Sequence, residues 1–460
     1  YTSYPWEMRK NVLIAVSIGT HFIELSRVAR LLKESDRFNP VIFFQYGYDA
    51  LERDVRVCIE EGWQYLAPPE KGKSQKRFRR ILLRFSPPTL LFPLLLSWKL
   101  AEYMYQGYQA ESLLNEYKPV LLAASEDVYL YVLIKTAKDL MIPSVIIPFT
   151  IANAREPAEA YFDRPEHIVS ASMINKLVAR KYPHWVYEHR DRKLLRNPAY
   201  DIVAIEHLGF APSSPWTYNS EGTVIAVEND FMFKYYRKEG LTPERMVVTG
   251  ALYDDLLVKV RKDADRLRAV LYRELELPSD RPLLLCALPP SQFPRKCEFN
   301  DYEQMVCFWM QTLASLSGWN IIVRPHPRMT DEEIEPLRKF GLAITNRDTA
   351  SLVPLCNIYV ASVSATIRWA IACGIPVVNY DVYQMDYEDF KEVGGVVTVN
   401  DGDSFITILK NLTSNHDYYE EVANRQRMEM AAWGKMDGKS GERMLKLFEH
   451  MIQKRLESKQ

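Results

Sequence analysis

The sequence is poor in cysteine, which excludes a disulfide scaffold and the common zinc sites. Six cysteines occur among 460 residues, with no Cys-x-x-Cys pair and no Cys/His spacing that would bind zinc. We expect free thiols in a reducing compartment and no bound metal. The cysteines predicted to be buried in apolar surroundings are Cys286, Cys307, Cys356 and Cys373.

The sequence also lacks a long hydrophobic run. No apolar stretch reaches the ~18–20 residues that a transmembrane helix needs. The nearest approach, Leu90 to Leu96, is short and contains Pro93. No signal peptide is visible at the amino terminus. We therefore expect a cytoplasmic protein.

Neither sign of charge is in excess. The chain has 58 Lys and Arg residues against 59 Asp and Glu residues, which gives a formal net charge of -1. Proteins that bind nucleic acid through their overall charge are strongly basic, so we expect no nucleic-acid partner.

One segment, residues 71–84, is strongly basic. Pro87–Pro88 and an apolar run from Leu90 to Trp98 follow it. This pattern predicts contact with an anionic membrane surface or a lipid-linked substrate, and hence a peripheral position at the inner membrane. The alternative is a solvated basic helix followed by a buried one. The basic residues are Lys71, Lys73, Lys76, Arg77, Arg79, Arg80 and Arg84.

Short apolar runs typical of buried strands alternate with helical segments along the chain, which predicts an α/β protein with parallel, doubly wound sheets. The strands are too many for one sheet. We expect a Rossmann-like domain at 1–238, a second at 239–425, and a helical segment at 426–460 that packs back. The predicted strands are Asn11–Ser17, Pro40–Phe44, Pro119–Ser125, Pro143–Pro148, Asp201–Ile205, Thr223–Val227, Val247–Thr249, Arg281–Leu288, Ile321–Arg324, Asn357–Ala361, Val377–Tyr380 and Gly395–Val399.

Two strand ends in the second half carry groups that suit a phosphate. One strand ends in Arg324-Pro325-His326-Pro327, and Thr330 then forms a capping box with Glu333 at a helix start. Ligands of open α/β sheets bind at the carboxyl ends of strands. The alternative for His326 is a packing role in the turn.

The second of these strand ends lies about thirty-six residues further on. The segment 362–366 carries Ser362, Ser364 and Thr366 and opens a helix that stops at Gly374. Hydroxyl groups and free backbone N–H groups at a helix start bind phosphate well. The alternative for Thr366 is a simple helix cap.

Carboxylates also follow predicted strands in the first half. Glu126-Asp127 ends one strand and Asp230 follows another, and for both the alternative is a helix N-cap. Glu156 lies in a loop before Pro157 where we expect no helix to cap. His21, near the start of the first helix, has an ordinary helix-start role as its alternative.

This organisation resembles the glycosyltransferase B (GT-B) architecture, in which two Rossmann-like domains face each other across a cleft. The run from Gly240 to Gly250 is similar to the segment that leads into the nucleotide-binding half of these enzymes. The His-Pro turn at His326 and the Ser362–Ser364 turn resemble the phosphate-binding motifs of transferases that use CMP-activated sugars. Bacterial sialyltransferases and Kdo transferases belong to this group.

Within it, the chain resembles the bacterial retaining β-Kdo transferases of the WbbB and KpsC type, which attach Kdo to O-antigen or capsule glycolipids. Glu156, the Glu228-Asn229-Asp230 run and the two phosphate motifs support the resemblance. It implies a CMP-Kdo donor, CMP as product, a glycolipid or oligosaccharide acceptor, and no cofactor. The acidic-acidic-Gly motif of sialyltransferases is incomplete, because Val128 follows Glu126-Asp127.

The resemblance gives each candidate residue an expected role. Asp230 is the expected nucleophile of a double displacement, oriented by Asn229, and Glu156 is the expected general base or acceptor-positioning group. The groups expected to bind the donor phosphate are Arg324, His326, Ser362, Ser364 and Thr366. A CMP-sialic acid or UDP-sugar transferase, and a non-catalytic nucleotide- or glycan-binding module, are the alternative functions.

Overall fold

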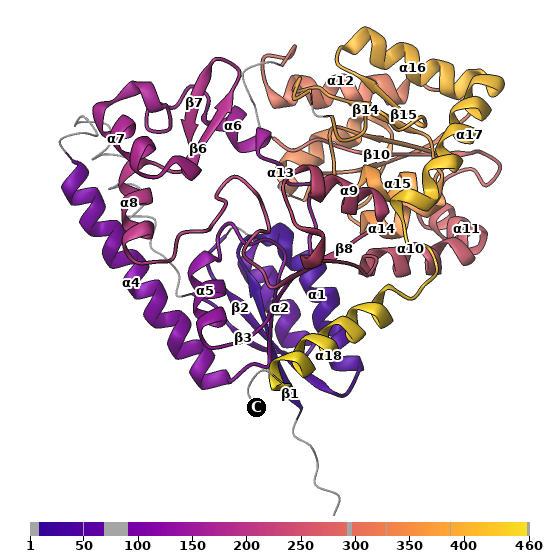
Figure 1. Cartoon of the computed structure of the whole chain (residues 1–460). Coiled ribbons are helices and arrows are strands. Elements are labelled where there is room, and N and C mark those ends of the chain that lie inside the picture. The colour runs from indigo at the N-terminus through magenta and orange to yellow at the C-terminus, as the bar shows by residue number, and fades with distance from the viewer. Residues whose placement is uncertain are drawn as a thin grey trace, which may run out of the picture. The chain divides into compact units, whose positions relative to one another are not determined.

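A computed structural model describes residues 9–48, 50–68, 91–291, 297–327, 329–386 and 388–457. The chain forms two compact units, and each is built around its own parallel sheet (Figure 1). The first unit comprises Tyr1–Val227, Phe233–Val248 and Glu442–Gln460, and the second comprises Glu228–Met232 and Thr249–Gly441.

The first unit has a seven-stranded sheet in the order β3-β2-β1-β4-β5-β8-β9. All neighbouring strands are parallel. Strand β4 is fully buried and β1 is buried from Val12 to Val16, as in parallel sheets covered on both faces. The strands are β1 (Lys10–Val16), β2 (Phe38–Phe44), β3 (Gln64–Leu66), β4 (Leu121–Ala124), β5 (Ser144–Ile146), β8 (Val224–Val227) and β9 (Met246–Val248).

A small antiparallel hairpin and a set of helices complete this unit. The hairpin pairs β6 (Val186–His189) with β7 (Arg192–Leu195). The helices are α1 (Gly19–Glu34), α2 (Leu51–Glu60), α4 (Phe92–Tyr117), α5 (Tyr131–Asp139), α6 (Arg155–Tyr161), α7 (Met173–Lys181) and α8 (Ala199–His207). Helix α18 (Ser440–Glu457) also packs here, since the Arg455 guanidinium donates to the carbonyls of Pro119 and Val120. The expectation that the C-terminal helices pack back is confirmed.

The second unit has a six-stranded parallel sheet in the order β12-β11-β10-β13-β14-β15. The order reverses between β10 and β13, as in a doubly wound fold. The strands are β10 (Leu283–Ala287), β11 (Asn320–Arg324), β12 (Ala343–Ile344), β13 (Ile358–Ala361), β14 (Val377–Tyr380) and β15 (Val396–Val399).

Helices cover both faces of this second sheet. An aromatic cluster packs helices against one face of the sheet. The centroid of the Trp309 ring lies 5.5 Å from that of Tyr380 and 5.0 Å from that of Phe405. The helices are α10 (Leu252–Lys262), α11 (Ala264–Glu274), α12 (Tyr302–Ala314), α13 (Asp331–Ile334), α14 (Thr349–Leu352), α15 (Ile367–Cys373), α16 (Gly402–Ser414) and α17 (His416–Trp433). The predicted α/β class with two Rossmann-like domains is confirmed.

One predicted strand is wrong. Residues 201–205 belong to helix α8, not to a strand. Ile202 and Ile205 pack with Trp185 in a small core cluster, and their spacing of three residues suits one face of a helix. A short apolar run fits both a strand and a buried helix, and the tertiary contacts decide between them.

The expectation of free thiols is confirmed. All six cysteines are free, although Cys307 is half-buried rather than buried. The capping box of Thr330 and Glu333 is present, but the helix that it opens is a single turn. Among the described residues, no helix is long and apolar enough to cross a membrane. The basic run at 71–84 and Arg328 lie outside the described residues.

Candidate active site

Strand β11 brings Arg324 and His326 to the carboxyl edge of the second sheet. Arg324 is the last residue of the strand, and its guanidinium donates to the carbonyls of Arg347, at 3.2 Å, and Pro325. His326 is half-buried in the turn that follows, with a proline on each side. Because proline restricts both itself and the residue before it, this turn has a defined shape.

The serine-rich segment follows β13 as a strained turn. Val363 has a φ of 43°, a value that β-branched residues rarely adopt. Its amide donates to Asn379 Oδ1 of the neighbouring strand β14 at 2.8 Å. A strained conformation persists when its surroundings hold it, and such strain is concentrated at functional sites.

The hydroxyl groups of this turn differ in their partners. Ser364 Oγ lies 2.8 Å from Thr366 Oγ1, which in turn lies 2.5 Å from the Tyr359 hydroxyl. Ser362 Oγ is buried and has no hydrogen-bond partner among the described residues. A buried hydroxyl left unpaired is destabilising, so a ligand atom is a physical reason for it.

Sheet topology sets the distance between the two turns. Strands β11 and β13 lie on either side of β10, and all three run parallel. Two strand spacings separate their ends by about 10 Å. The sheet therefore carries the His326 turn and the Ser362 turn on one edge, at the point where the strand order reverses.

The segment that contains Asp230 belongs to the same compact unit. The Glu228 carboxylate pairs with the Arg368 guanidinium at 2.7 Å, and the two side chains are only 2% and 1% exposed. Arg368 Nε also donates to the Ala365 carbonyl at 3.1 Å. The buried ion pair therefore fastens the Asp230 segment to the serine turn.

Asn229 fixes the backbone here rather than the Asp230 side chain. Its Oδ1 accepts from the Met232 amide at 2.8 Å, and its Nδ2 donates to the Trp433 carbonyl at 2.8 Å. The expectation that Asn229 orients Asp230 is wrong, because both ends of the carboxamide are used elsewhere. The alternative role of Asp230 as a helix N-cap is also wrong, since Asn229 caps helix α9 (Asp230–Lys238).

Asp230 is the first residue of α9, and its carboxylate contacts Lys435 instead. The distance from Lys435 Nζ to Asp230 Oδ2 is 2.9 Å, and the Asp230 side chain is 55% exposed. Phe231 stacks on Trp433 with centroids 3.8 Å apart, which positions the start of the helix. Asp230 is thus an accessible carboxylate on a fixed backbone.

Glu156 lies in the first unit and starts a helix. The expectation that its loop has no helix to cap is wrong, because α6 begins at Arg155. Asn153 Oδ1 accepts from the Glu156 amide at 3.0 Å and so caps the first turn. Pro157 is tolerated because first-turn N–H groups have no intrahelical partner. The Glu156 side chain is exposed.

His21 and Glu126 form a buried pair at the carboxyl ends of β1 and β4. The sequence analysis names each residue but does not predict that they meet. His21 Nδ1 lies 3.0 Å from Ser17 Oγ, and His21 Nε2 lies 3.6 Å from Glu126 Oε2. Thr150 donates to the other Glu126 oxygen. Only the pairing of β1 with β4, far apart in sequence, brings these groups together.

The surroundings of Glu126 favour its ionised form. Burial, the largest influence, raises the pKa of Glu126, but the opposing effects of His21, Thr150 and the charge of Arg196 outweigh it. The pKa of Glu126 is therefore lowered from its ordinary value. An ionised carboxylate beside an imidazole is a candidate acid–base pair at this edge.

Asp127 has a structural role. Its two carboxylate oxygens accept from the amides of Asn219, at 2.8 Å, and Glu221, at 2.9 Å. Burial raises the pKa of Asp127 to about 7, despite these hydrogen bonds. It does not cap helix α5, which begins at Tyr131, so the expected N-cap role is wrong for this residue. In the described part of the chain, no group of three His, Cys, Asp or Glu side chains is arranged to hold a metal ion.

No family model and no curated protein sequence matches this chain. Solved structures do match it. UDP-GlcNAc 2-epimerase from Neisseria meningitidis aligns with a TM-score of 0.53 and 12% identity, over 96% of this chain and 100% of that one. The wall teichoic acid polymerase TagF gives 0.54 and 13%, over 98% and 90%. MnaA from S. aureus, solved with UDP, gives 0.55 and 12%, over 96% and 97%.

At these identities the likeness shows the fold alone. The chain has the GT-B fold that these enzymes share, as the resemblance in sequence predicted. The comparisons leave the donor and the mechanism open.

The raised pKa of Asp127 predicts a pH-dependent stability. Between the unfolded value of about 3.9 and the folded value of about 7, the folded protein retains a proton that the unfolded chain releases. The free energy of unfolding should therefore fall as pH rises through this range, by up to about 1.4 kcal/mol per unit. The Asp127→Asn variant has no titrating group at this position. We expect the difference in the free energy of unfolding, wild type minus variant, to fall as pH rises to about 7 and then to level off. Urea unfolding at pH 5 to 8.5 measures this difference. A pH-independent difference would contradict this interpretation.

Proposed function

We propose that this protein is a glycosyltransferase that moves Kdo from CMP-β-Kdo to a bacterial surface glycan with retention of configuration. One observation carries the proposal. The Glu228–Arg368 ion pair and the Arg368–Ala365 hydrogen bond join the Asp230 segment to the serine turn. A carboxylate suited to nucleophilic attack and hydroxyls suited to a phosphate thus belong to one compact unit.

The groups at the carboxyl edge of the second sheet suit the phosphate of the donor. Departure of CMP needs charge neutralisation rather than a strong acid, and cationic or hydroxyl donors supply it. We assign Arg324, His326, Ser362 and Ser364 to direct contact with the phosphate. We assign Thr366 to positioning, because its hydroxyl already contacts both Tyr359 and Ser364.

Asp230 is the proposed nucleophile. Its carboxylate would attack the anomeric carbon as the bond to CMP breaks, giving a covalent Kdo–Asp230 ester, and an acceptor hydroxyl would then displace the carboxylate. Two inversions at one carbon give overall retention. The exposed carboxylate and its contact with the flexible ammonium of Lys435 suit this role. Glu156 is the proposed general base or acceptor-positioning group, and its exposed side chain is open to a bulky acceptor.

A UDP-sugar transferase is the second candidate. It is supported by the ligands bound in two similar structures, UDP-GlcNAc in the Neisseria meningitidis epimerase and UDP in MnaA. The phosphate-binding groups of the second sheet would serve either nucleotide. The nucleobase and the sugar of the donor therefore distinguish the two candidates.

Helix α4 supports a peripheral membrane location. The basic run 71–84 precedes it in the sequence, and one face of the helix exposes large apolar or aromatic side chains. Leu94, Trp98, Tyr105 and Tyr108 are 58%, 45%, 61% and 72% exposed, and their spacing places them on one face. A basic segment that is followed in the sequence by a helix with an aromatic face suits an anionic membrane surface that carries the glycolipid acceptor.

The donor assignment predicts selective stabilisation by CMP. A ligand that binds only the folded state raises stability by about 2.7 kcal/mol at a hundredfold excess over Kd. Thermal unfolding of the purified chain should therefore shift upward with CMP, and less with UDP or GDP. In the Ser362→Ala variant the shift should shrink, as one charge-assisted hydrogen bond is worth roughly 1.5–3 kcal/mol.

The same experiment separates a ligand-binding role from a structural one. Because Ser362 Oγ has no partner among the described residues, Ser362→Ala should not lower the melting temperature of the unliganded protein. The matched control is His416→Ala, an exposed residue of the same unit, which should keep the full CMP shift. A larger shift with UDP would favour the second candidate, and no shift with any nucleotide would contradict both.

The membrane proposal predicts binding to anionic vesicles. Replacing Lys76, Arg77, Arg79 and Arg80 by Glu should weaken co-sedimentation with phosphatidylglycerol vesicles, and so should Trp98→Ala. Leu177→Ala is the control, since Leu177 is 60% exposed on α7 of the same unit. Unchanged binding in the charge-reversed variant would leave only the solvated-helix interpretation.

A further inference from the structure

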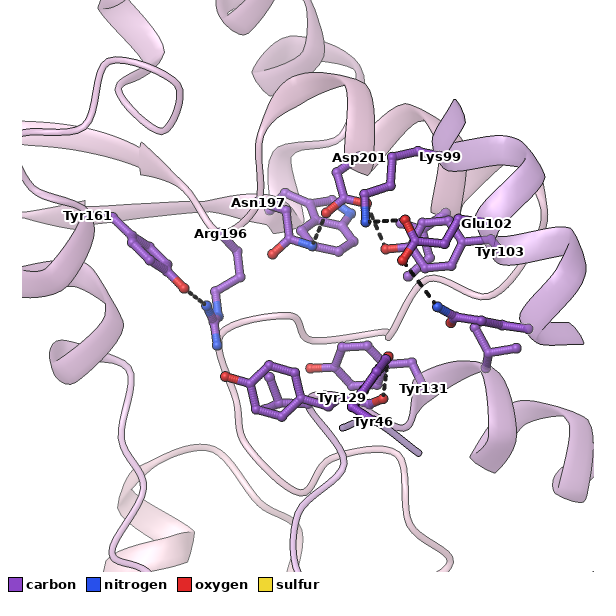
Figure 2. Close-up of a pocket in the computed structure, with 15 residues that line it drawn as sticks. Tyr46, Lys99, Glu102, Tyr103, Tyr129, Tyr131, Tyr161, Arg196, Asn197 and Asp201 are labelled. Atoms are coloured by element: carbon purple, nitrogen blue, oxygen red, sulfur yellow. Dashed lines mark hydrogen bonds and ion pairs between the residues drawn. The ribbon is translucent and has the colours of Figure 1, made fainter. Parts of the chain in front are cut away.

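The first unit contains a cavity whose lining includes none of the residues assigned above to the donor phosphate, the nucleophile or the base. Its volume is about 260 Å³, and aromatic side chains from several elements line it (Figure 2). Tyr46 follows β2, Tyr129 follows β4, and Tyr161 ends α6. Helices α4 and α8 supply the opposite wall with polar groups.

Arg196 borders this cavity with an unusual set of partners. The residue is 6% exposed, and its guanidinium donates to the hydroxyls of Tyr161, at 3.0 Å, and Tyr218, at 3.3 Å. Its Nε has no hydrogen-bond partner among the described residues. In that same part of the chain, no carboxylate lies within ion-pair distance of it, and the charge of the buried Glu126 carboxylate acts on it only from further away.

A buried cation without an anion in contact is costly. Two phenol hydroxyls and the faces of Tyr161, Trp216 and Tyr218, each 5.6 Å from the guanidinium, compensate only part of the lost hydration. The guanidinium is a planar fork that binds carboxylate or phosphate through two parallel hydrogen bonds. An anionic group in the cavity would therefore supply the contacting negative charge that the Arg196 guanidinium lacks.

The far wall offers different chemistry. The Asp201 carboxylate accepts from the Tyr103 hydroxyl at 2.7 Å and from Asn197 Nδ2 at 3.1 Å, and Lys99 pairs with Glu102 at 3.0 Å. Figure 2 shows these groups across the cavity from Arg196. Carboxylates and amides of this kind exchange hydrogen bonds with sugar hydroxyls, and the aromatic faces suit the apolar face of a sugar ring.

We propose that this cavity binds one acidic sugar, with its carboxylate or phosphate on Arg196 and its hydroxyls toward Asp201 and Glu102. The inference rests on the proposed function, because it makes the cavity a saccharide subsite of a glycosyltransferase. Such a sugar has two possible sources, namely the transferred sugar of the donor and a residue of the acceptor glycan. The binding chemistry is the same for both.

The test is a ligand-detected NMR titration of the full chain with four small probes. Methyl β-D-glucuronide and glucose 6-phosphate carry the anion on a sugar, methyl β-D-glucoside is the neutral match, and acetate is the anion alone. At least one acidic sugar should bind ten times more tightly than the glucoside and acetate. Arg196→Gln should weaken this binding at least tenfold, and Tyr129→Ala should also weaken it, since Tyr129 is 52% exposed and can be changed without disturbing the core.

Two control variants and one competition complete the design. Tyr65→Ala, 36% exposed on β3 and outside the cavity, and Arg180→Gln, exposed on α7, should bind the acidic sugar like the wild type. Displacement of the bound acidic sugar by CMP-Kdo would assign the cavity to the donor sugar. Simultaneous binding of both would assign it to the acceptor.

The outcomes separate this inference from the proposed function. A CMP-induced thermal shift that persists in Arg196→Gln shows a folded nucleotide site, whatever the acidic sugar does. Equal binding of all four probes, no binding of either acidic sugar, or unchanged binding in Arg196→Gln would overturn the inference. No CMP shift in the wild type, together with acidic-sugar binding that Arg196→Gln weakens, would instead contradict the donor assignment and leave the saccharide subsite standing.

Discussion

The buried ion pair between Glu228 and Arg368 is the constraint on which the second unit's candidate site depends. The two residues are 140 positions apart in sequence, and their side chains are almost fully buried. Burying two charges is costly unless each has a well-placed partner, and removing one partner costs about 3–5 kcal/mol. Few arrangements satisfy that requirement. Together with the hydrogen bond to Ala365, the pair therefore fixes the start of α9 against the serine turn.

Local sequence pattern predicted much of this structure. Buried parallel strands such as β10 and β13 are continuous apolar runs, and the capping box at Thr330 is a short-range signal. The serine turn was placed correctly because it directly follows such a strand. The segment 201–205 was predicted as a strand because its helical character depends on packing against Trp185, which no local pattern reveals.

The parts of the site that the sequence did not predict depend on long-range contacts. His21 and Glu126 meet because β1 pairs with β4, a neighbour more than a hundred residues away. Arg368 is the second residue of a short helix, and nothing in its local sequence indicates a partner at Glu228. Asn229 was expected to orient Asp230, but its carboxamide is occupied by Met232 and Trp433. Motif spacing locates strand ends, whereas tertiary structure decides which side chains meet there.

Two buried polar groups in different units point to ligands for the same physical reason. Ser362 Oγ lacks a hydrogen-bond partner, and the Arg196 guanidinium contacts no carboxylate, among the described residues. Each arrangement reduces the stability of the unliganded protein, and binding sites commonly have this property. In our account the second unit binds the nucleotide phosphate at Ser362, and the first unit binds an acidic sugar at Arg196.

The covalent step is tested most directly by the intact mass of the protein after brief incubation with CMP-Kdo and an acid quench. Our account predicts a species heavier by one Kdo residue in the wild type and in Asp265→Asn, whose carboxylate is fully exposed on α11. The same species should be missing in Asp230→Asn. An adduct of equal yield in Asp230→Asn, or release of CMP without any adduct in the wild type, would contradict the assignment of Asp230 as the nucleophile.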